Sequence, residues 1–182
     1  MLFTNENTTV LDRVMADGFS GEERQSYDLG PGLRCLLIFR LEREIARSSR
    51  VMEATLRVPV LGPPGQPGGL GVSNILRPWD PETVSWSSPW SKPGGAEGID
   101  YSTVRAVPLI APAAGSIEIV ELDVTADVQR WARGRASNVG WMLHGDVRIG
   151  GRSNALMGAT PTVDVKYIDG APAAPGAGLG GL

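Results

Sequence analysis

The distribution of glycine and proline limits the length of every regular segment that this chain can form. The 182 residues include 24 glycines and 14 prolines, and both residue types favour turns and oppose the interiors of helices and strands. Several of the short segments between them alternate apolar and polar side chains, which is typical of a strand with one buried face. The chain is therefore expected to consist mainly of short β-strands.

The clearest alternation runs from Val51 to Val60. Five of its side chains are expected to face the core, namely Met52, Ala54, Leu56, Val58 and Val60, while Glu53, Thr55 and Arg57 face away. The other predicted strands are Thr8–Met15, Arg34–Leu41, Gly71–Leu76, Ser102–Ile110, Ser116–Leu122, Val139–His144 and Thr162–Ile168. Seven or eight short strands predict an all-β fold in which two antiparallel sheets pack as a β-sandwich.

One short helix is predicted over Thr125–Arg133, because Val124, Val128 and Trp131 recur at helical spacing. Asp123 or Thr125 can cap its first free N–H groups, and Gly134 ends it. We expect Trp131 to cover one end of the sandwich and the helix to be a connector without a catalytic role.

The composition changes at residue 170, which divides the chain into a β-sandwich domain over residues 1–169 and a tail over residues 170–182. The tail, Gly170–Leu182, is rich in glycine, alanine and proline and has too little apolar bulk to offset its own ordering entropy. We expect contacts with an adjacent subunit to hold it in an extended form.

Charge and hydropathy argue against several classes of partner. Seventeen basic residues against twenty acidic ones give a net charge of -3, so no basic face and no nucleic-acid partner are expected. No apolar run is long enough for a membrane helix, and residues 1–7 lack the pattern of a signal peptide. The single cysteine, Cys35, lies in an apolar run and is predicted to be buried and inert.

The motifs of common enzymes are missing from the sequence. There is one histidine, His144, predicted to be a solvated or hydrogen-bonded residue at a strand end. No HExxH, CxxC, GxxxxGK or GxSxG pattern is present. Two pairs of acids, Asp80 with Glu82 and Glu22 with Glu23, are close enough in sequence for glycosidase chemistry, but adjacent acids in loops are usually only solvated. We predict no catalytic residues, no metal ligands and no cofactor.

Three of the five tryptophans, Trp79, Trp86 and Trp90, cluster in one loop-rich segment. Exposed tryptophans stack on sugar rings, so Trp90 and Trp79 are the candidate binding residues for a glycan. Trp90, flanked by serines and prolines, is expected to be the most exposed. In the alternative interpretation, Trp79 and Trp86 anchor a long loop onto the core.

Two separated segments are similar to one known family. Leu76–Trp86, with Trp79, Asp80, Thr83 and Trp86 in order, resembles the W-(D/E)-E-x-T-V-T-W signature of DNRLRE-type domains. Leu122–Trp131, followed by Gly134 and Asn138–Gly140, resembles their D-V-T-x-x-V-Q-x-W-x-x-G-x-x-N-x-G stretch. Further matches are Arg34–Phe39 with the R-x-L-L-x-F strand and Glu53–Val58 with the A-x-L-x-L strand, so the resemblance covers residues 33–168.

The resemblance implies a jelly-roll-like β-sandwich and a non-catalytic accessory module of the kind found on bacterial surface proteins and carbohydrate-active enzymes. Our leading hypothesis is a structural protein on the surface of a virion, such as a bacteriophage capsid decoration, fibre or spike component. It would be assembled in the host cytoplasm as a homo-oligomer, with a trimer favoured, beside other virion proteins. The alternative is a carbohydrate-binding module outside the cell or on its surface, and a third hypothesis, a calcium-dependent adhesion domain, rests only on scattered loop acids.

Overall fold

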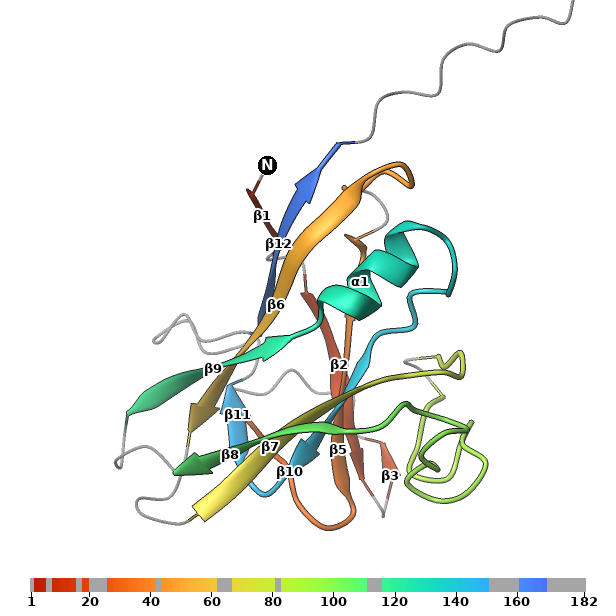
Figure 1. Ribbon diagram of the computed structural model, residues 1–182. Helices are drawn as coiled ribbons and strands as arrows, with labels where there is room; N and C mark the ends of the chain where they lie inside the picture. Colours follow the sequence, from red (N-terminus) through yellow and green to blue (C-terminus); the bar gives the residue numbers. More distant parts are fainter. Residues whose placement is uncertain are drawn as a thin grey trace, which may run out of the picture.

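The structure is a computed structural model of the 182-residue chain. It describes residues 2–5, 8–15, 18–19, 26–41, 44–61, 67–80, 83–110, 116–150 and 161–169. Within these ranges the chain forms two antiparallel sheets and one short helix, α1 (Thr125–Ala132) (Figure 1). No helix of these ranges is long and apolar enough to cross a membrane. The predicted tail, residues 170–182, lies outside the described residues.

The two sheets divide the described strands equally. Sheet A contains β1 (Leu2–Asn5), β4 (Ser26–Asp28), β6 (Arg50–Leu61), β9 (Ile117–Asp123), β11 (Arg148–Gly150) and β12 (Thr162–Ile168). Sheet B contains β2 (Thr8–Met15), β3 (Gly18–Phe19), β5 (Leu33–Phe39), β7 (Pro67–Asn74), β8 (Arg105–Ile110) and β10 (Trp141–Gly145).

The strands from β4 to β11 are connected as a jelly roll. They form four nested antiparallel pairs, β7 with β8, β6 with β9, β5 with β10 and β4 with β11. Successive pairs alternate between the sheets, which places β4-β11-β6-β9 in sheet A and β5-β10-β7-β8 in sheet B. This is the eight-stranded double-sheet arrangement of a jelly roll. The predicted all-β, jelly-roll-like antiparallel β-sandwich with one short helix is confirmed.

The main core lies between the two sheets. Alternate residues of each strand point into it, as the two-residue repeat of a strand requires. Sheet A contributes side chains such as Leu56, Val58 and Val165, while sheet B contributes Cys35, Leu37, Phe39, Val72, Trp141 and Leu143. The predicted burial of Cys35 is confirmed, since it has no exposed surface.

A β-bulge in β6 corrects one of the predicted core positions. Glu53 pairs with Lys166 and Val51 pairs with Tyr167, which leaves Met52 as an extra residue without a partner on β12. The extra residue shifts the alternation by one position. Val51 is therefore buried, whereas the Met52 side chain is 50% exposed. The prediction for Met52 was wrong, while Ala54, Leu56, Val58 and Val60 face the core as expected.

The longer strands were predicted well and the shortest were missed. Thr8–Met15 and Thr162–Ile168 match β2 and β12 at both ends, and the other predicted strands overlap β5, β6, β7, β8, β9 and β10. Four strands of two to four residues, β1, β3, β4 and β11, were not predicted. Segments this short contain too few side chains to display an alternation, and their pairing depends on distant partners.

Helix α1 begins and ends close to where the sequence placed it. The Oδ1 atom of Asp123 accepts a hydrogen bond of 2.9 Å from the backbone N–H of Thr125, so Asp123 and not Thr125 satisfies the first free donor. At the other end, Gly134 has a φ of +65° and donates to the carbonyl of Trp131. The N–H of Arg135 donates to the carbonyl of Arg130, which completes a Schellman motif.

The helix covers one end of the sandwich, as predicted (Figure 1). Val128 and Trp131 both belong to the main core, and the Trp131 ring lies 4.7 Å from the ring of Trp141 on β10. The same helix buries the carboxylate of Asp127. This carboxylate accepts hydrogen bonds from Arg105 and Arg130, each 2.5 Å long, and from the indole N–H of Trp141 at 2.9 Å.

We expect Trp131→Ala to be among the most destabilising single substitutions in the domain. The Trp131 side chain is 8% exposed and packs on Trp141, and truncation of a core tryptophan costs about 3–5 kcal/mol. Urea denaturation followed by circular dichroism measures the effect.

Ile99→Ala is the matched control, because the Ile99 side chain is 60% exposed and its truncation should change the unfolding free energy by less than about 1 kcal/mol. If the two variants unfold at the same urea concentration, the position of α1 against the core is incorrect.

Candidate functional site

The predicted site residues Trp79 and Trp90 lie in the long connection between β7 and β8, residues 75–104. This connection folds back over the outer face of sheet B (Figure 1). Leu36 of β5 and Met142 of β10 point to that face and make it apolar, so its burial from water stabilises the fold. The connection covers this face and makes a third layer with a second, smaller hydrophobic core.

Trp90 lies at the centre of this second core and not at the surface. Its side chain is 6% exposed and is buried in one cluster with Leu36, Ile75, Val84 and Met142. Its indole N–H donates to the carbonyl of Ser85 at 2.9 Å. The expectation that Trp90 is the most exposed tryptophan was therefore wrong. Its serine and proline neighbours shape the turns around it, but the apolar face of sheet B determines where the ring lies.

Trp79 and Trp86 are partly buried against the same cluster. The indole N–H of Trp79 donates to the carbonyl of Val139 at 2.7 Å. The guanidinium of Arg34 lies 5.5 Å from the ring centre of Trp86. The alternative interpretation, in which Trp79 and Trp86 anchor the loop onto the core, is confirmed.

Gly94 shows how tightly the Trp86 ring is enclosed. Its φ is +76°, a conformation that favours glycine. A Cβ atom at this position would lie 2.5 Å from Cζ2 of Trp86, which is far below contact distance. The second core is thus closed by backbone as well as by side chains.

A buried carboxylate, Asp100, organises the loop above this core. It accepts hydrogen bonds from the backbone N–H and the hydroxyl of Ser91 and from the N–H of Ala96, and it pairs with Nε of Arg77 at 2.9 Å. Burial alone would raise the pKa of Asp100, but the donors of Ser91 and Ala96 and the charge of Arg77 outweigh it and lower the pKa. Sequence reasoning missed this residue, since a single aspartate between Ile99 and Tyr101 has no recognisable spacing.

His144 lies near the end of β10 and is hydrogen-bonded, as predicted. Its Nε2 atom is 2.8 Å from the hydroxyl of Ser73, and its ring centre is 5.0 Å from that of Tyr101. Burial and, to a lesser extent, the charge of Arg34 lower the pKa of His144 to about 4. A serine hydrogen-bonded to a neutral histidine can begin a nucleophilic mechanism, but Ser73 has no exposed surface. In this conformation its hydroxyl is closed to a substrate, and the pair is explained as a satisfied contact between strands.

A small hollow lies beside Trp79. It has a volume of about 340 Å³ and is lined by Pro78, Trp79, Asp80, Thr83, Ser88 and Pro89. One partly exposed indole with a carboxylate and two hydroxyls is the kind of lining that can accept a single sugar ring. Of the predicted binding residues, only Trp79 therefore remains available to a glycan.

The acidic pairs considered for catalysis or calcium binding are only partly described. Asp80 is exposed, while Glu82, Glu22 and Glu23 lie outside the described residues. Among the residues with defined positions, no group of three or more histidine, cysteine, aspartate or glutamate side chains is arranged to hold a metal ion.

Comparison with known proteins yields no assignment, because no family model and no curated protein matches the chain. The resemblance to DNRLRE-type domains stays a prediction that rests on the motifs of residues 76–86 and 122–140.

The low pKa of His144 predicts acid destabilisation at mild pH. An unfolded histidine titrates near pH 6.5, whereas folded His144 resists protonation until about pH 4. Between these values the unfolded chain binds more protons, so stability falls as the pH is lowered, by up to about 1.4 kcal/mol per pH unit.

Urea denaturation at several pH values between about 7 and 4.5 measures this slope. His144→Gln keeps an amide for Ser73 and removes the titrating group, so its slope should be smaller than that of the wild type. Equal slopes for the two proteins would show that His144 is not shielded from protonation.

Proposed function

We propose that this chain is a non-catalytic structural protein on the surface of a virus particle, such as a bacteriophage capsid decoration, fibre or spike component. The jelly-roll connectivity from β4 to β11 supports this role, because jelly rolls are frequent in viral capsid proteins. They are also frequent in lectins, and a fold by itself does not select a function. The choice between a capsid protein and a lectin depends on which side chains this domain exposes.

The inward position of the loop tryptophans carries the proposal. A platform for sugar rings needs exposed aromatic faces, but Trp90 is buried and Trp86 packs between Arg34 and Gly94. The loop uses its aromatic surface to stabilise a third layer on sheet B. This use of tryptophan favours a rigid structural module over an aromatic glycan platform.

Assembly with other subunits is part of the proposal, and a homo-oligomer, with a trimer favoured, is the expected form. Strands β6, β9 and β12 of sheet A each expose one large apolar side chain, Met52, Ile119 and Ile168, at 46% or more. Contacts with neighbouring copies or other virion proteins would bury them. The protein would be assembled in the host cytoplasm and become part of the virion surface, with residues 170–182 extending along a neighbour.

A carbohydrate-binding module is the second candidate, and the hollow beside Trp79 is the observation that favours it. The hollow combines an indole with the carboxylate of Asp80 and two hydroxyl groups. In that case the protein would act outside the cell or on its surface, and Trp79 would be the single stacking residue.

The assembly state tests the structural proposal directly. Size-exclusion chromatography with light scattering should give a mass of three times the 19.3 kDa of the chain. A variant ending at Asp169 should remain folded and lose part of this association. A full-length protein that stays monomeric at every concentration would contradict the proposed homo-oligomer.

Affinity electrophoresis in gels containing soluble polysaccharides separates the two candidates. The structural role predicts that wild type and Trp79→Ala migrate alike in every gel. Retardation of the wild type that Trp79→Ala abolishes, while Asp164→Asn on sheet A retains it, would replace the structural proposal with the glycan-binding one. Capsid, portal or tail genes beside the gene for this chain would support the virion assignment independently.

A further inference from the structure

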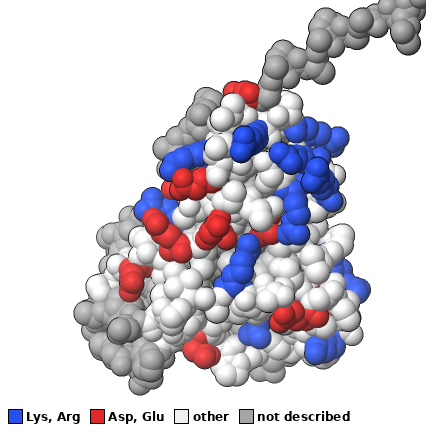
Figure 2. Space-filling view, viewed as in Figure 1, with Lys and Arg blue, Asp and Glu red and all other residues white. Residues whose placement is uncertain are grey.

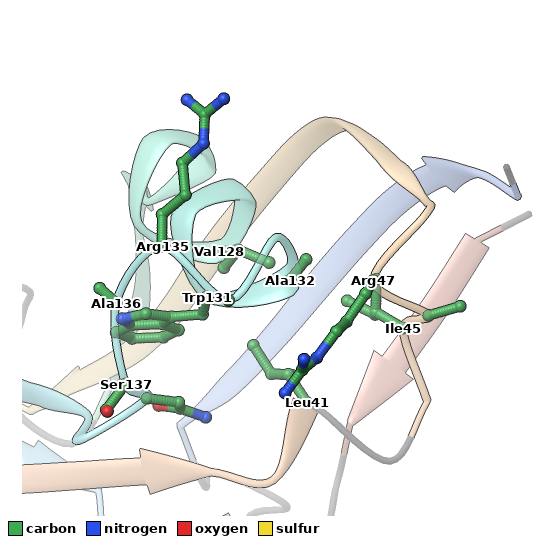
Figure 3. A pocket seen from close by; sticks show the side chains of 12 residues that line it. Leu41, Ile45, Arg47, Val128, Trp131, Ala132, Arg135, Ala136 and Ser137 are labelled. Atoms are coloured by element: carbon green, nitrogen blue, oxygen red, sulfur yellow. The ribbon is translucent and has the colours of Figure 1, made fainter.

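A cavity lies at the end of the sandwich that α1 covers. It has a volume of about 770 Å³, within the range of small-molecule sites. Its walls come from two parts of the chain that are distant in sequence (Figure 3). One wall is the last turn of α1 with residues 134–138, and the other is formed by Leu41 and residues 45–47, between β5 and β6.

Side chains of the main core form part of the lining of this cavity, beside polar residues such as Ser137 and Asn138. Leu41, Ile45, Val128, Trp131 and Ala132 line it, and all five belong to the main core. A ligand that enters would therefore place an apolar body against core side chains. The indole N–H of Trp131 is a buried polar group of the same wall and has no hydrogen-bond partner among the described residues. This N–H has almost no exposed surface in this conformation, so the case for a ligand rests on the core side chains and on Arg47 and not on this donor.

Arg47 provides a positive charge at the mouth of the cavity. In Figure 3 its side chain reaches from the connection after β5 towards Leu41 and the cavity, whereas the side chain of Arg135 extends away from it. A Cβ atom at Gly134 would lie 3.8 Å from Nε and Cζ of Arg47, so the guanidinium lies beside the end of α1. An alanine at Gly134 would therefore contact this side chain.

Three arginines lie at this end of the molecule, and no acid of the described residues neutralises them. Arg47, Arg133 and Arg135 are exposed, and no ion pair joins them to a carboxylate of the described residues. The buried acid of α1, Asp127, is already paired with Arg105 and Arg130. Figure 2 shows Lys and Arg side chains gathered over this end of the molecule.

The net charge of the chain predicted no basic face, and this prediction does not hold at the end of the molecule that α1 covers. A sum over the whole chain does not show where charges lie. Arginines near a helix C-terminus also interact favourably with the helix dipole, and this accounts for Arg133 and Arg135. The dipole does not account for a cavity that remains open beside Arg47 with core side chains in its lining.

We propose that this cavity binds a small carboxylate with an apolar body. The carboxylate would pair with the guanidinium of Arg47, which favours carboxylate geometry, and the apolar body would lie on Leu41, Val128 and Trp131. The positive surroundings would attract the anion. The proposal goes beyond the structural role and does not depend on it.

Isothermal titration calorimetry of the full chain tests this site, with 4-phenylbutyrate as the probe. Its neutral amide has the same body without the charge, and glucuronate has the charge without the apolar body. We expect 4-phenylbutyrate to bind with a Kd of about 1 mM or tighter, and each of the other two at least about tenfold more weakly.

Three variants locate the site. Arg47→Gln should weaken binding of 4-phenylbutyrate about tenfold, because it removes the charge and keeps the fold. Ala136→Leu, which fills the cavity from its wall, should weaken binding at least as much. Arg148→Gln on β11, outside the cavity, should leave the Kd unchanged within about twofold.

Each contrary result overturns the proposal. No measurable heat with the wild type at about 10 mM probe would exclude the site. Equal affinity for the amide would remove the role of the charge, and tighter binding of glucuronate would make the cavity a saccharide site. Equal effects of Arg47→Gln and Arg148→Gln would place binding elsewhere.

Discussion

The buried carboxylate of Asp127 holds the helix α1 onto sheet B. The chain leaves sheet A at β9, forms α1 and enters sheet B at β10, so α1 is the connection between the layers. Asp127 lies on α1 and accepts hydrogen bonds from Arg105 of β8, from Arg130 of the same helix and from the indole N–H of Trp141 on β10. A buried charge is tolerated only when it is paired and hydrogen-bonded. The three donors reach Asp127 only when α1 is placed correctly on sheet B. The network therefore specifies the position of α1 at the end of the sandwich.

The long connection between β7 and β8 repeats this arrangement on the outer face of sheet B. Asp100 is its buried acid, and Ser91, Ala96 and Arg77 are its donors. Around it, Trp90 and its neighbours form a core of their own on Leu36 and Met142. Sheet B is therefore buried on both faces, which explains why Cys35, Leu36 and Leu37 are all inaccessible. Among the described residues, no such layer covers Met52 and Ile168 of sheet A, and this asymmetry is why we propose that its outer face meets other subunits.

The polar groups of the protein thus have two different uses. Asp127, Asp100 and the Ser73–His144 pair are saturated by partners inside the domain, and their chemistry stabilises the fold. Arg47 lines a cavity that also exposes core side chains, and no ion pair joins it to a carboxylate of the described residues. Saturated buried networks rigidify a structure, whereas an unpaired charge beside an apolar concavity is a feature of binding sites. This contrast is the reason that the cavity under α1, and not the tryptophan loop, carries our inference about a ligand.

The sequence by itself determined the local features of this protein. Alternation specified the strands from β5 to β12 with the exception of the very short β11, and the spacing of Val124, Val128 and Trp131 with Gly134 specified α1. These patterns can be recognised in the sequence because a regular helix or strand turns its residues towards the core at a fixed spacing. Tertiary structure decided the exceptions. The bulge at Met52 depends on the register between β6 and β12. The burial of Trp90 depends on the outward side chains of sheet B. Asp100 and Asp127 find their partners only when distant segments fold together. Positions that depend on contacts between segments far apart in sequence leave no periodic signal along the chain. For that physical reason the jelly roll could be predicted in outline, whereas the second core under the β7–β8 connection and the cavity beside Arg47 could not.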